Sequence, residues 1–477
     1  MEVIVAMLDE SLAFVSTAEL RELILGKKIS PVEITELYIR RIETLNGTLN
    51  AFITCTFDEA LHSAAKAEKD IMNDRTPGLL QGVPIAVKDL EMTEGIRTTS
   101  GSTVYRDRIP TEDSVVVERI KSAGAVILGK TNTPEFGLLG ETRNNLGDDC
   151  RNPWNISKTS GGSSGGSAAA VSSGMCSLAT GSDGGGSIRI PASFTGTYGI
   201  KPTQGRVPRY PDVLPPLSNQ TSQPGPIGRS MEDCALLMQV IAGYDSRDAS
   251  SIRSKAPDFM SAVGSDIDGI RLGWTSDFGY ADVEPEVLQI CREAVNSYRS
   301  LGATVDDSDF CIDDPFEQWY ALFSVKSMAS NSDIWPSRGE EMTEYTRQAY
   351  EYAEQISAAD FSRALGRIDL VKDKLRDQFG KYDLLLSPTM AVQPFDCGIP
   401  PRAIDGINTD GSWKCLPFTY PINLAGNPAA SIPVGLTQAG LPVGLQIIGA
   451  FGAEEMVIAA SSAFEKLGYW QHQNPPI

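Results

Sequence analysis

The chain has 477 residues, of which 41% are apolar and 21% are charged, a composition typical of a folded globular protein with a sizeable core. Its 41 lysines and arginines against 61 aspartates and glutamates give a net charge of −20. Such a charge repels phosphate backbones and anionic lipid surfaces. Composition therefore argues against a nucleic-acid or membrane partner.

The first residues, MEVIVAMLDESLAF, lack the basic region and the small-residue cleavage site of a secretory signal. No apolar run reaches the roughly 18 residues that a membrane-spanning helix needs. We therefore expect a cytoplasmic protein.

Helix-start signals mark the N-terminal region. The sequences S-T-A-E at 16–19 and S-P-V-E at 30–33 have the spacing of a capping box, the second with proline at the first helical position. They predict two helices over about 17–46, and a third is expected over 57–72. We expect this helical region to fill residues 1–74.

Strands then alternate with helices. Short apolar runs predict strands at 83–87, 125–128 and 177–180, while helical periodicity predicts helices at 114–124 and 167–173. This alternation favours an α/β layered fold.

A proline-rich segment at 205–228 follows. We expect that it cannot pair as a central strand and that it forms a loop at the rim of a cleft. Helices are expected over 285–301 and within 343–379, and 382–388 and 442–449 are expected to return as strands of the same sheet. The sequence contains no repeat and no clear linker.

One motif is misleading. Gly124, Gly129, Lys130 and Thr131 satisfy the nucleotide-binding pattern G-x-x-x-x-G-K-[ST]. A phosphate-binding loop must lie between those glycines, but the intervening AVIL is itself a predicted strand. The pattern therefore does not indicate a nucleotide site.

Histidine is scarce. Only His62, inside a predicted surface helix, and His472, five residues from the C-terminus, could serve a His-dependent triad or metal site. The eight cysteines stand singly without a C-x-x-C motif, which favours reduced thiols. We expect no metal and no cofactor.

Two glycine-rich runs suggest chemistry. SGGSSGGSAAA at 160–170 has a linker composition, but it continues into an apolar segment, which argues against a linker. In GSDGGGSIRIP at 181–191, three glycines precede Ser187, and residues without Cβ atoms let backbone N–H groups converge on an oxyanion. A plain tight turn is the alternative for an isolated GGGS.

Other residues favour catalysis. Lys88 ends the apolar stretch VPIAVK, where a lysine can be held out of water, and Ser163 and Ser187 supply hydroxyls that can pass a proton. For Lys88 to act as a base near neutral pH, its pKa of about 10.4 must fall by roughly 3 units, which burial could impose.

In this order, GVPIAVKD, GKTNTPEFG, GGSSGGSAAAV, GSDGGGSIRIPAS and GIKPTQGRV resemble the amidase signature family, strongly over 77–207 and weakly toward the C-terminus. The resemblance implies one large α/β/α domain over 1–477 with a mixed central sheet. Its signature core would span 75–210, with 229–477 as the remainder of the same domain.

The resemblance also implies a Ser-cisSer-Lys triad. Ser187 matches the nucleophile, Ser163 the cis-peptide serine and Lys88 the lysine. The family's oxyanion hole falls on the backbone N–H groups from Gly184 through Gly185 and Gly186 to Ser187. Supporting positions, expected to orient the triad, fall on Ser164, Asp183 and Arg189.

The expected function is hydrolysis of amide C–N bonds through an acyl-enzyme, on apolar aryl or alkyl amides or on carbamates. The expected substrate contacts are Phe136, Leu139, Tyr210 and Leu214. A monomer or homodimer is expected.

Two alternatives stay open, a glutaminase-type component of a tRNA-dependent amidotransferase and a non-enzymatic binding protein. Against the first, residues 346–375 lack the tyrosine-rich stretch associated with such components; against the second stands the intact triad.

Overall fold

The computed structural model of the protein describes residues 9–211, 221–401, 403–404, 407–408, 415–470 and 473–477. Its strands are β1 (Phe52–Cys55), β2 (Pro84–Lys88), β3 (Val126–Thr131), β4 (Arg151–Asn152), β5 (Asn155–Thr159), β6 (Leu178–Asp183), β7 (Tyr198–Lys201), β8 (Gln223–Gly228), β9 (Arg271–Trp274), β10 (Thr304–Asp307), β11 (Leu384–Pro388), β12 (Ala403–Ile404), β13 (Ile407–Asn408), β14 (Ala429–Leu436) and β15 (Pro442–Gly449).

Its α-helices are α1 (Thr17–Leu25), α2 (Pro31–Leu49), α3 (Phe57–Met72), α4 (Val115–Ser122), α5 (Gly165–Ser172), α6 (Arg189–Thr195), α7 (Met231–Ile241), α8 (Phe259–Ala262), α9 (Pro285–Ser297), α10 (Phe316–Ser330), α11 (Glu344–Glu354), α12 (Ala358–Phe379), α13 (Tyr420–Ala425) and α14 (Glu454–Glu465). Short 3-10 helices are η1 (Glu10–Phe14), η2 (Thr103–Tyr105), η3 (Glu135–Gly137), η5 (Tyr298–Leu301) and η6 (Gly339–Glu341).

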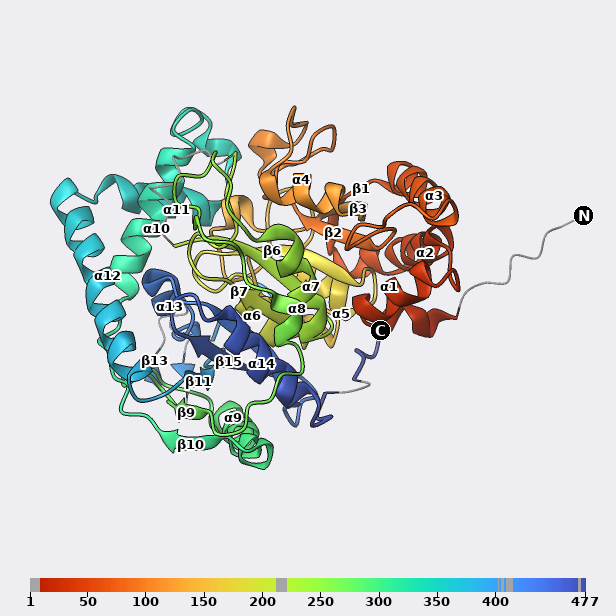
Figure 1. Cartoon of the computed structure of the whole chain (residues 1–477). Helices are drawn as coiled ribbons and strands as arrows, with labels where there is room; N and C mark the ends of the chain where they lie inside the picture. Colours follow the sequence, from red (N-terminus) through yellow and green to blue (C-terminus); the bar gives the residue numbers. More distant parts are fainter. Residues whose placement is uncertain (1–8, 212–220, 402, 405–406, 409–414, 471–472) are drawn as a thin grey trace, which may run out of the picture.

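Within the described residues, eleven strands form one sheet across the molecule, in the order β1-β3-β2-β6-β8-β7-β14-β15-β11-β9-β10 (Figure 1). Strands β3, β2 and β6 are parallel, as are β11, β9 and β10. From β6 through β8, β7, β14 and β15 to β11, neighbouring strands are antiparallel. The predicted α/β layered fold with a mixed sheet is confirmed, and β11 and β15 do return to it.

Helices cover both faces of this sheet. A Cβ at Gly444 would meet Ser193 of α6, whereas one at Gly449 would meet Val457 of α14. These two glycines are five residues apart on β15, and an odd separation along a strand places side chains on opposite faces. Helices α6 and α14 therefore pack on different faces, and α14 lies with α7 and α8 in the front of Figure 1.

The N-terminal helices begin where the capping signals predicted. The hydroxyl of Ser30 and the carboxylate of Glu33 form a capping box at α2, with Pro31 in the first turn. At α1, the N–H of Thr17 donates to Oδ1 of Asp233 at 2.6 Å. Asp233 also closes the capping box of α7, so one carboxylate caps two helices that are distant in the sequence.

Strand β3 contains the residues of the misleading G-x-x-x-x-G-K-[ST] pattern. Residues 126–131 are all extended and buried, as expected for the AVIL segment. Lys130 donates to Thr93 Oγ1 at 2.7 Å, to Thr98 Oγ1 at 3.0 Å and to the carbonyl oxygen of Glu91. The lysine therefore holds a loop of its own chain.

The expectation for 205–228 is wrong at its C-terminal end. Residues 223–228 form β8, an interior strand between β6 and β7. Its prolines, Pro224 and Pro226, alternate, so their missing N–H groups face the same side of the strand. Pairing with β7 covers only Ile227 and Gly228, beyond both prolines. The strand is thus interior without needing a ladder donor from either proline.

The predicted helical region at 343–379 consists of two helices, α11 and α12. Ser357 forms the capping box of α12 with Asp360, which starts a new helix after the first has ended. His62 lies on α3 and is exposed, as predicted, whereas His472 lies outside the described residues.

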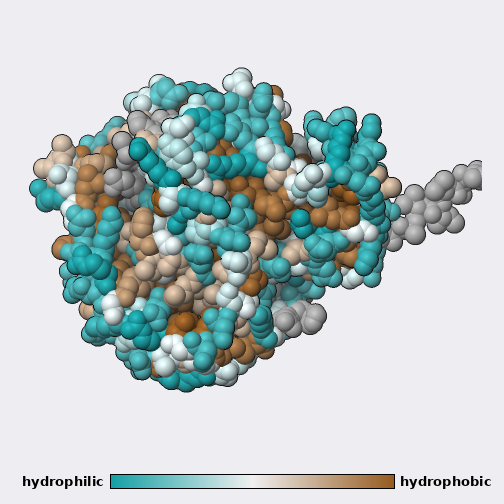
Figure 2. Space-filling view, viewed as in Figure 1, coloured by the Kyte–Doolittle hydropathy of each residue, from teal (hydrophilic) through white to brown (hydrophobic). Residues whose placement is uncertain are grey.

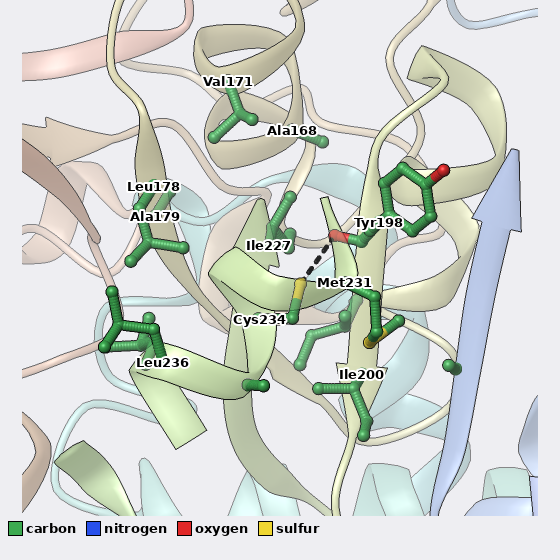
Figure 3. Packing of buried hydrophobic residues seen from close by; sticks show 14 of the residues in the cluster. Ala168, Val171, Leu178, Ala179, Tyr198, Ile200, Ile227, Met231, Cys234 and Leu236 are labelled. Carbon is green, nitrogen blue, oxygen red and sulfur yellow. Dashed lines mark hydrogen bonds between the residues drawn. The ribbon is translucent and has the colours of Figure 1, made fainter. Parts of the chain in front are cut away.

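The core contains tightly packed apolar side chains where α7 meets β6, β8 and β7 (Figure 3). Met231 and Cys234 of α7 are fully buried, as are Ile227 and Ile200 of the adjacent strands. The thiol of Cys234 donates to the carbonyl oxygen of Tyr198 at 3.4 Å. This buried thiol fits the prediction of reduced cysteines.

Hydrophilic residues cover most of the face seen in Figure 2, with apolar patches between them. None of the helices in the described part of the chain has the length and apolar character to cross a membrane.

Candidate active site

Lys88 is the last residue of β2, and its side chain is fully buried. Its Nζ lies 2.9 Å from Ser163 Oγ and 2.8 Å from Ser164 Oγ. The same nitrogen is 3.0 Å from Ser182 Oγ and 3.4 Å from the Ser182 carbonyl oxygen. A neutral amine has two N–H donors and one lone pair, so it can donate to two of these oxygens and accept a hydroxyl proton from a third.

Burial lowers the pKa of Lys88 from 10.5 to about 7, because the charged form loses its hydration. The negative charges of Asp183 and Glu91 oppose this shift, while the positive charge of Arg209 adds to it. At neutral pH a large share of the lysine is therefore uncharged, with a lone pair that can accept a proton.

Ser163 lies in the packed turn that leads into α5. The peptide bond between Gly162 and Ser163 is cis, and residues 160–170 are buried throughout. A Cβ at Gly162 would lie 2.6 Å from the backbone of Glu141, and one at Gly166 would lie 2.3 Å from the amide nitrogen of Asn132. The glycines therefore allow close backbone packing, and the interpretation against a linker is confirmed.

Ser187 follows the glycine run that ends β6, and it is 8% exposed. Gly186 has φ of +123°, which favours glycine, and its N–H donates to Asp183 Oδ1 at 2.7 Å. Among the described residues, no hydrogen-bond partner is found for the amide N–H groups of Gly185 and Ser187. Those two donors are available to an oxyanion, whereas the Gly186 donor is engaged.

A buried ion pair lies behind the glycine run. Arg189 donates to both carboxylate oxygens of Asp183, each at 2.9 Å, and to Gln446 Oε1 at 2.6 Å. Asn423 donates to Asp183 Oδ1 at 2.8 Å. Burial acts to raise the pKa of Asp183, but the charge and hydrogen bonds of Arg189 outweigh it and hold the pKa well below its usual value. The carboxylate also accepts the N–H of Ile188, so the pair fixes the backbone on both sides of Ser187.

A cavity of about 220 Å³ opens in front of these groups, with Ser163, Ser182, Gly184 and Ser187 in its wall. Its apolar lining comprises Leu90, Met92, Phe136, Leu138, Pro208, Tyr210, Pro211, Pro224 and Phe323. The charged residues in its lining are Glu91, Arg108, Arg209 and Lys326. Lys88 lies behind the serines, so the cavity reaches the lysine only through hydroxyl groups.

Two of the four predicted substrate contacts line this cavity. Phe136 is stacked on Tyr350, with ring centroids 6.4 Å apart, and Tyr210 also belongs to the lining. Leu139 does not belong to the described lining, where its neighbour Leu138 lies instead. Leu214 lies outside the described residues.

Ser182 and α10 contribute to the site in a way that sequence reasoning missed. Ser182 directly precedes Asp183, and only the fold shows that it contacts Lys88. Phe323, Lys326 and Ser327 of α10 line the cavity, although no local motif marks them. Within the part of the chain that the structure describes, no group of three or more His, Cys, Asp or Glu side chains is arranged to hold a metal ion.

Comparisons with known proteins match this architecture. A family model described as Amidase matches residues 33–458. The chain is 34% identical to an acylamidase of Rhodococcus erythropolis, covering 98% of both chains. It is 37% identical to the GatA-type component of the glutamyl-tRNA(Gln) amidotransferase of Moorella thermoacetica, covering 98% of this chain and 99% of that protein.

Solved structures agree. A bacterial aryl acylamidase of the amidase signature family superimposes with a TM-score of 0.90 at 34% identity, covering 96% of this chain and 97% of that one. The structure of 6-aminohexanoate cyclic dimer hydrolase gives 0.87 at 28% identity, with coverage of 97% and 99%.

A mixed sheet of this order and a buried lysine among serines thus define an amide-hydrolysing enzyme. The chain belongs to the amidase signature family.

Proposed function

We propose that the protein cleaves apolar aryl or alkyl amides through an acyl-enzyme on Ser187, with Ser163 and Lys88 as the proton relay. The observation that carries this proposal is the 2.9 Å contact between Lys88 Nζ and Ser163 Oγ, made by a fully buried lysine. Ser163 and Ser187 line the same cavity. A base is thus linked by one hydroxyl to the wall that carries the proposed nucleophile.

In the proposed first step, Ser187 Oγ attacks the amide carbonyl carbon. Its proton moves to Ser163 Oγ while the Ser163 proton moves to the lone pair of Lys88 Nζ. When the tetrahedral intermediate collapses, Lys88 returns the proton through Ser163 to the departing nitrogen, which then leaves as a neutral amine. Water, activated by the same relay, then cleaves the acyl-enzyme.

The proposed oxyanion donors are the backbone N–H groups at the glycine run. Those of Gly185 and Ser187 are favoured within the predicted set Gly184 to Ser187, because the Gly186 donor binds Asp183. The ion pair of Asp183 with Arg189 supports this assignment, since it fixes the loop that presents these donors. Fixed donors stabilise developing charge without reorganisation.

An apolar substrate group is supported by the cavity wall. Leu90, Met92, Leu138 and Phe323 offer apolar surface near the serines, and apolar lining with few polar groups is typical of small-molecule sites. The relatives described as acylamidases favour the same substrate class. Carbamates present a similar carbonyl, so they belong to the same proposal.

Glutamine hydrolysis is the second candidate function. It is favoured by the 37% identity to the amidotransferase component of Moorella thermoacetica over nearly the whole chain. Such a function would use partner proteins to deliver the ammonia.

The test is to purify the chain alone and assay an anilide, an aryl carbamate and glutamine. We expect turnover of the anilide, and a mass increase on Ser187 equal to the acyl group when the reaction is quenched early. Ser187→Ala should lose both signals, whereas Ser300→Ala, which removes an exposed hydroxyl, should lose neither. Glutamine turnover without anilide turnover would favour the second candidate, and acylation of a different residue would refute the role of Ser187.

A further inference from the structure

The three glycines before Ser187 differ in what a side chain would meet. A Cβ at Gly185 would lie 2.2 Å from the ring of Trp319, and one at Gly186 would lie 2.3 Å from Thr419 Oγ1. At Gly184 the nearest atoms are Phe323 Cε2 at 3.2 Å and Ser222 Cβ at 3.3 Å, and its φ is outside the left-handed region. Packing therefore demands glycine at 185 and 186, but it leaves room for a small side chain at 184.

The space beside Gly184 belongs to the cavity. Gly184, Ser187, Ser222 and Phe323 all line it. Phe323 is partly exposed, and its ring stacks on Trp319 with centroids 4.9 Å apart and an interplanar angle of 19°. The wall opposite the missing side chain is therefore an aromatic ring.

This aromatic wall is held in place relative to the glycine run. Trp319 Nε1 donates to the carbonyl oxygen of Gly184 at 2.9 Å, and Trp319 itself is fully buried. The ring of Phe323 therefore rests on a side chain that is hydrogen-bonded to Gly184. The width of the gap is set by this packing, and a side chain at residue 184 would narrow it.

We propose that Gly184 is a specificity-determining residue: its missing side chain leaves a space beside Ser187, between Ser222 and Phe323, that receives a bulky apolar group of the substrate. The inference rests on the proposed role of Ser187 and specifies the substrate class of that site. An aromatic or branched group suits this space, because it would bury its surface against the ring of Phe323.

Gly184→Ala tests this inference with two substrate series. One series comprises anilides of acetic, isobutyric and benzoic acid, and the other comprises acetyl amides of ammonia, aniline and 1-naphthylamine. We expect kcat/KM to fall by about tenfold or more for the bulkiest member of one series and to stay within about twofold for its smallest member. Gly47→Ala adds a methyl group to an exposed site with no atom within 4 Å, and it should leave the ratios unchanged.

The compensating variant is Phe323→Leu, which widens the gap from the other side. Combined with Gly184→Ala, it should recover turnover of the bulky member that the single variant lost, because residues sharing one space act non-additively. An equal loss for every substrate, no change for any substrate, or no recovery in the double variant would overturn the inference. Failure of the proposed function would differ, since the wild-type protein would then show no acyl group on Ser187.

Discussion

Lys88 and Lys130 lie on neighbouring parallel strands and share two unusual properties. Both are fully buried, and the register pairs Val87 with Lys130 and Lys88 with Thr131. Burial lowers the pKa of Lys88 to about 7 and that of Lys130 to about 8. By burial and pKa alone, either lysine would serve as a base.

Their oxygen partners distinguish them. Two of the serines that contact Lys88, Ser163 and Ser182, line the cavity. The hydroxyls that contact Lys130 belong to Thr93 and Thr98, which are fully buried. A lowered pKa therefore becomes useful for catalysis only where a hydroxyl connects the amine to the substrate cavity.

The largest difference is expected when each lysine is replaced by methionine. Lys88→Met should lower kcat/KM by about 10³-fold or more, since it removes the proposed base. Lys130→Met should keep the greater part of its activity per folded molecule, because Lys130 contacts none of the three proposed catalytic residues. Anilide turnover by the two folded variants measures the contrast, and equal losses would contradict it.

Replacing the connecting hydroxyl should have the next largest effect. Ser163→Ala removes the link between Lys88 and the cavity, and we expect a loss of about 10²-fold in kcat/KM. The loss should be smaller than for Lys88→Met, because water can bridge part of the proton path. Initial rates with the same anilide decide the order, and undiminished activity in Ser163→Ala would contradict the relay.

The pH dependence of activity should also distinguish the two lysines. If the neutral amine of Lys88 is the base, kcat/KM of the wild type should rise with pH through about 7 and fall about tenfold per pH unit below that value. The profile of the Lys130→Met variant should keep its inflection. A flat profile between pH 5 and 8 would argue against a lysine base.

Stability should separate the two lysines in the opposite sense. Lys130→Met leaves three buried acceptors without their donor, which should cost about 3 kcal/mol or more of unfolding free energy. Lys88→Met should be at least as stable as the wild type at pH 7, because it removes a buried amine with an unfavourable titration. Urea midpoints compare the two, and a Lys88→Met variant that is several kcal/mol less stable would identify Lys88 as a charged structural anchor.

The smallest expected effect is the pH dependence of stability. The folded pKa of Lys88 is lowered to about 7 from 10.5, so between these values the unfolded chain binds more protons and stability rises with pH. The wild type should therefore gain about 2 kcal/mol over Lys88→Met between pH 7 and pH 9. Urea unfolding at both pH values measures the gain, and a constant difference would mean that the native pKa of Lys88 is not lowered.

Local signals predicted the N-terminal half of the fold well. The S-P-V-E sequence at 30–33 specifies a helix start through its own side chains, and α2 begins there. Short apolar runs such as VPIAV became buried strands. The proline rule failed for β8, because whether a missing donor matters depends on which neighbour pairs with that strand, and this is a tertiary property.

The proposed site was only partly predictable. Lys88, Ser163 and Ser187 lie in glycine-rich or apolar motifs whose chemistry can be read locally. Ser182 and Phe323 could not be found this way, because Ser182 matters through its contact with Lys88 and Phe323 through the placement of α10 over the glycine run. Both depend on distances between segments far apart in the chain.

The position of β14 and β15 within the sheet has a consequence for biosynthesis. These strands join β7 to β11, so the part of the sheet built from β11, β9 and β10 connects to the rest only through them. They are also the last strands of this sheet to leave the ribosome, and β15 carries Gln446, which binds Arg189 behind the glycine run. A nascent chain that lacks them has two unjoined sheet segments with exposed edges, which invite aggregation. The protein therefore gains its complete site only after synthesis has nearly ended.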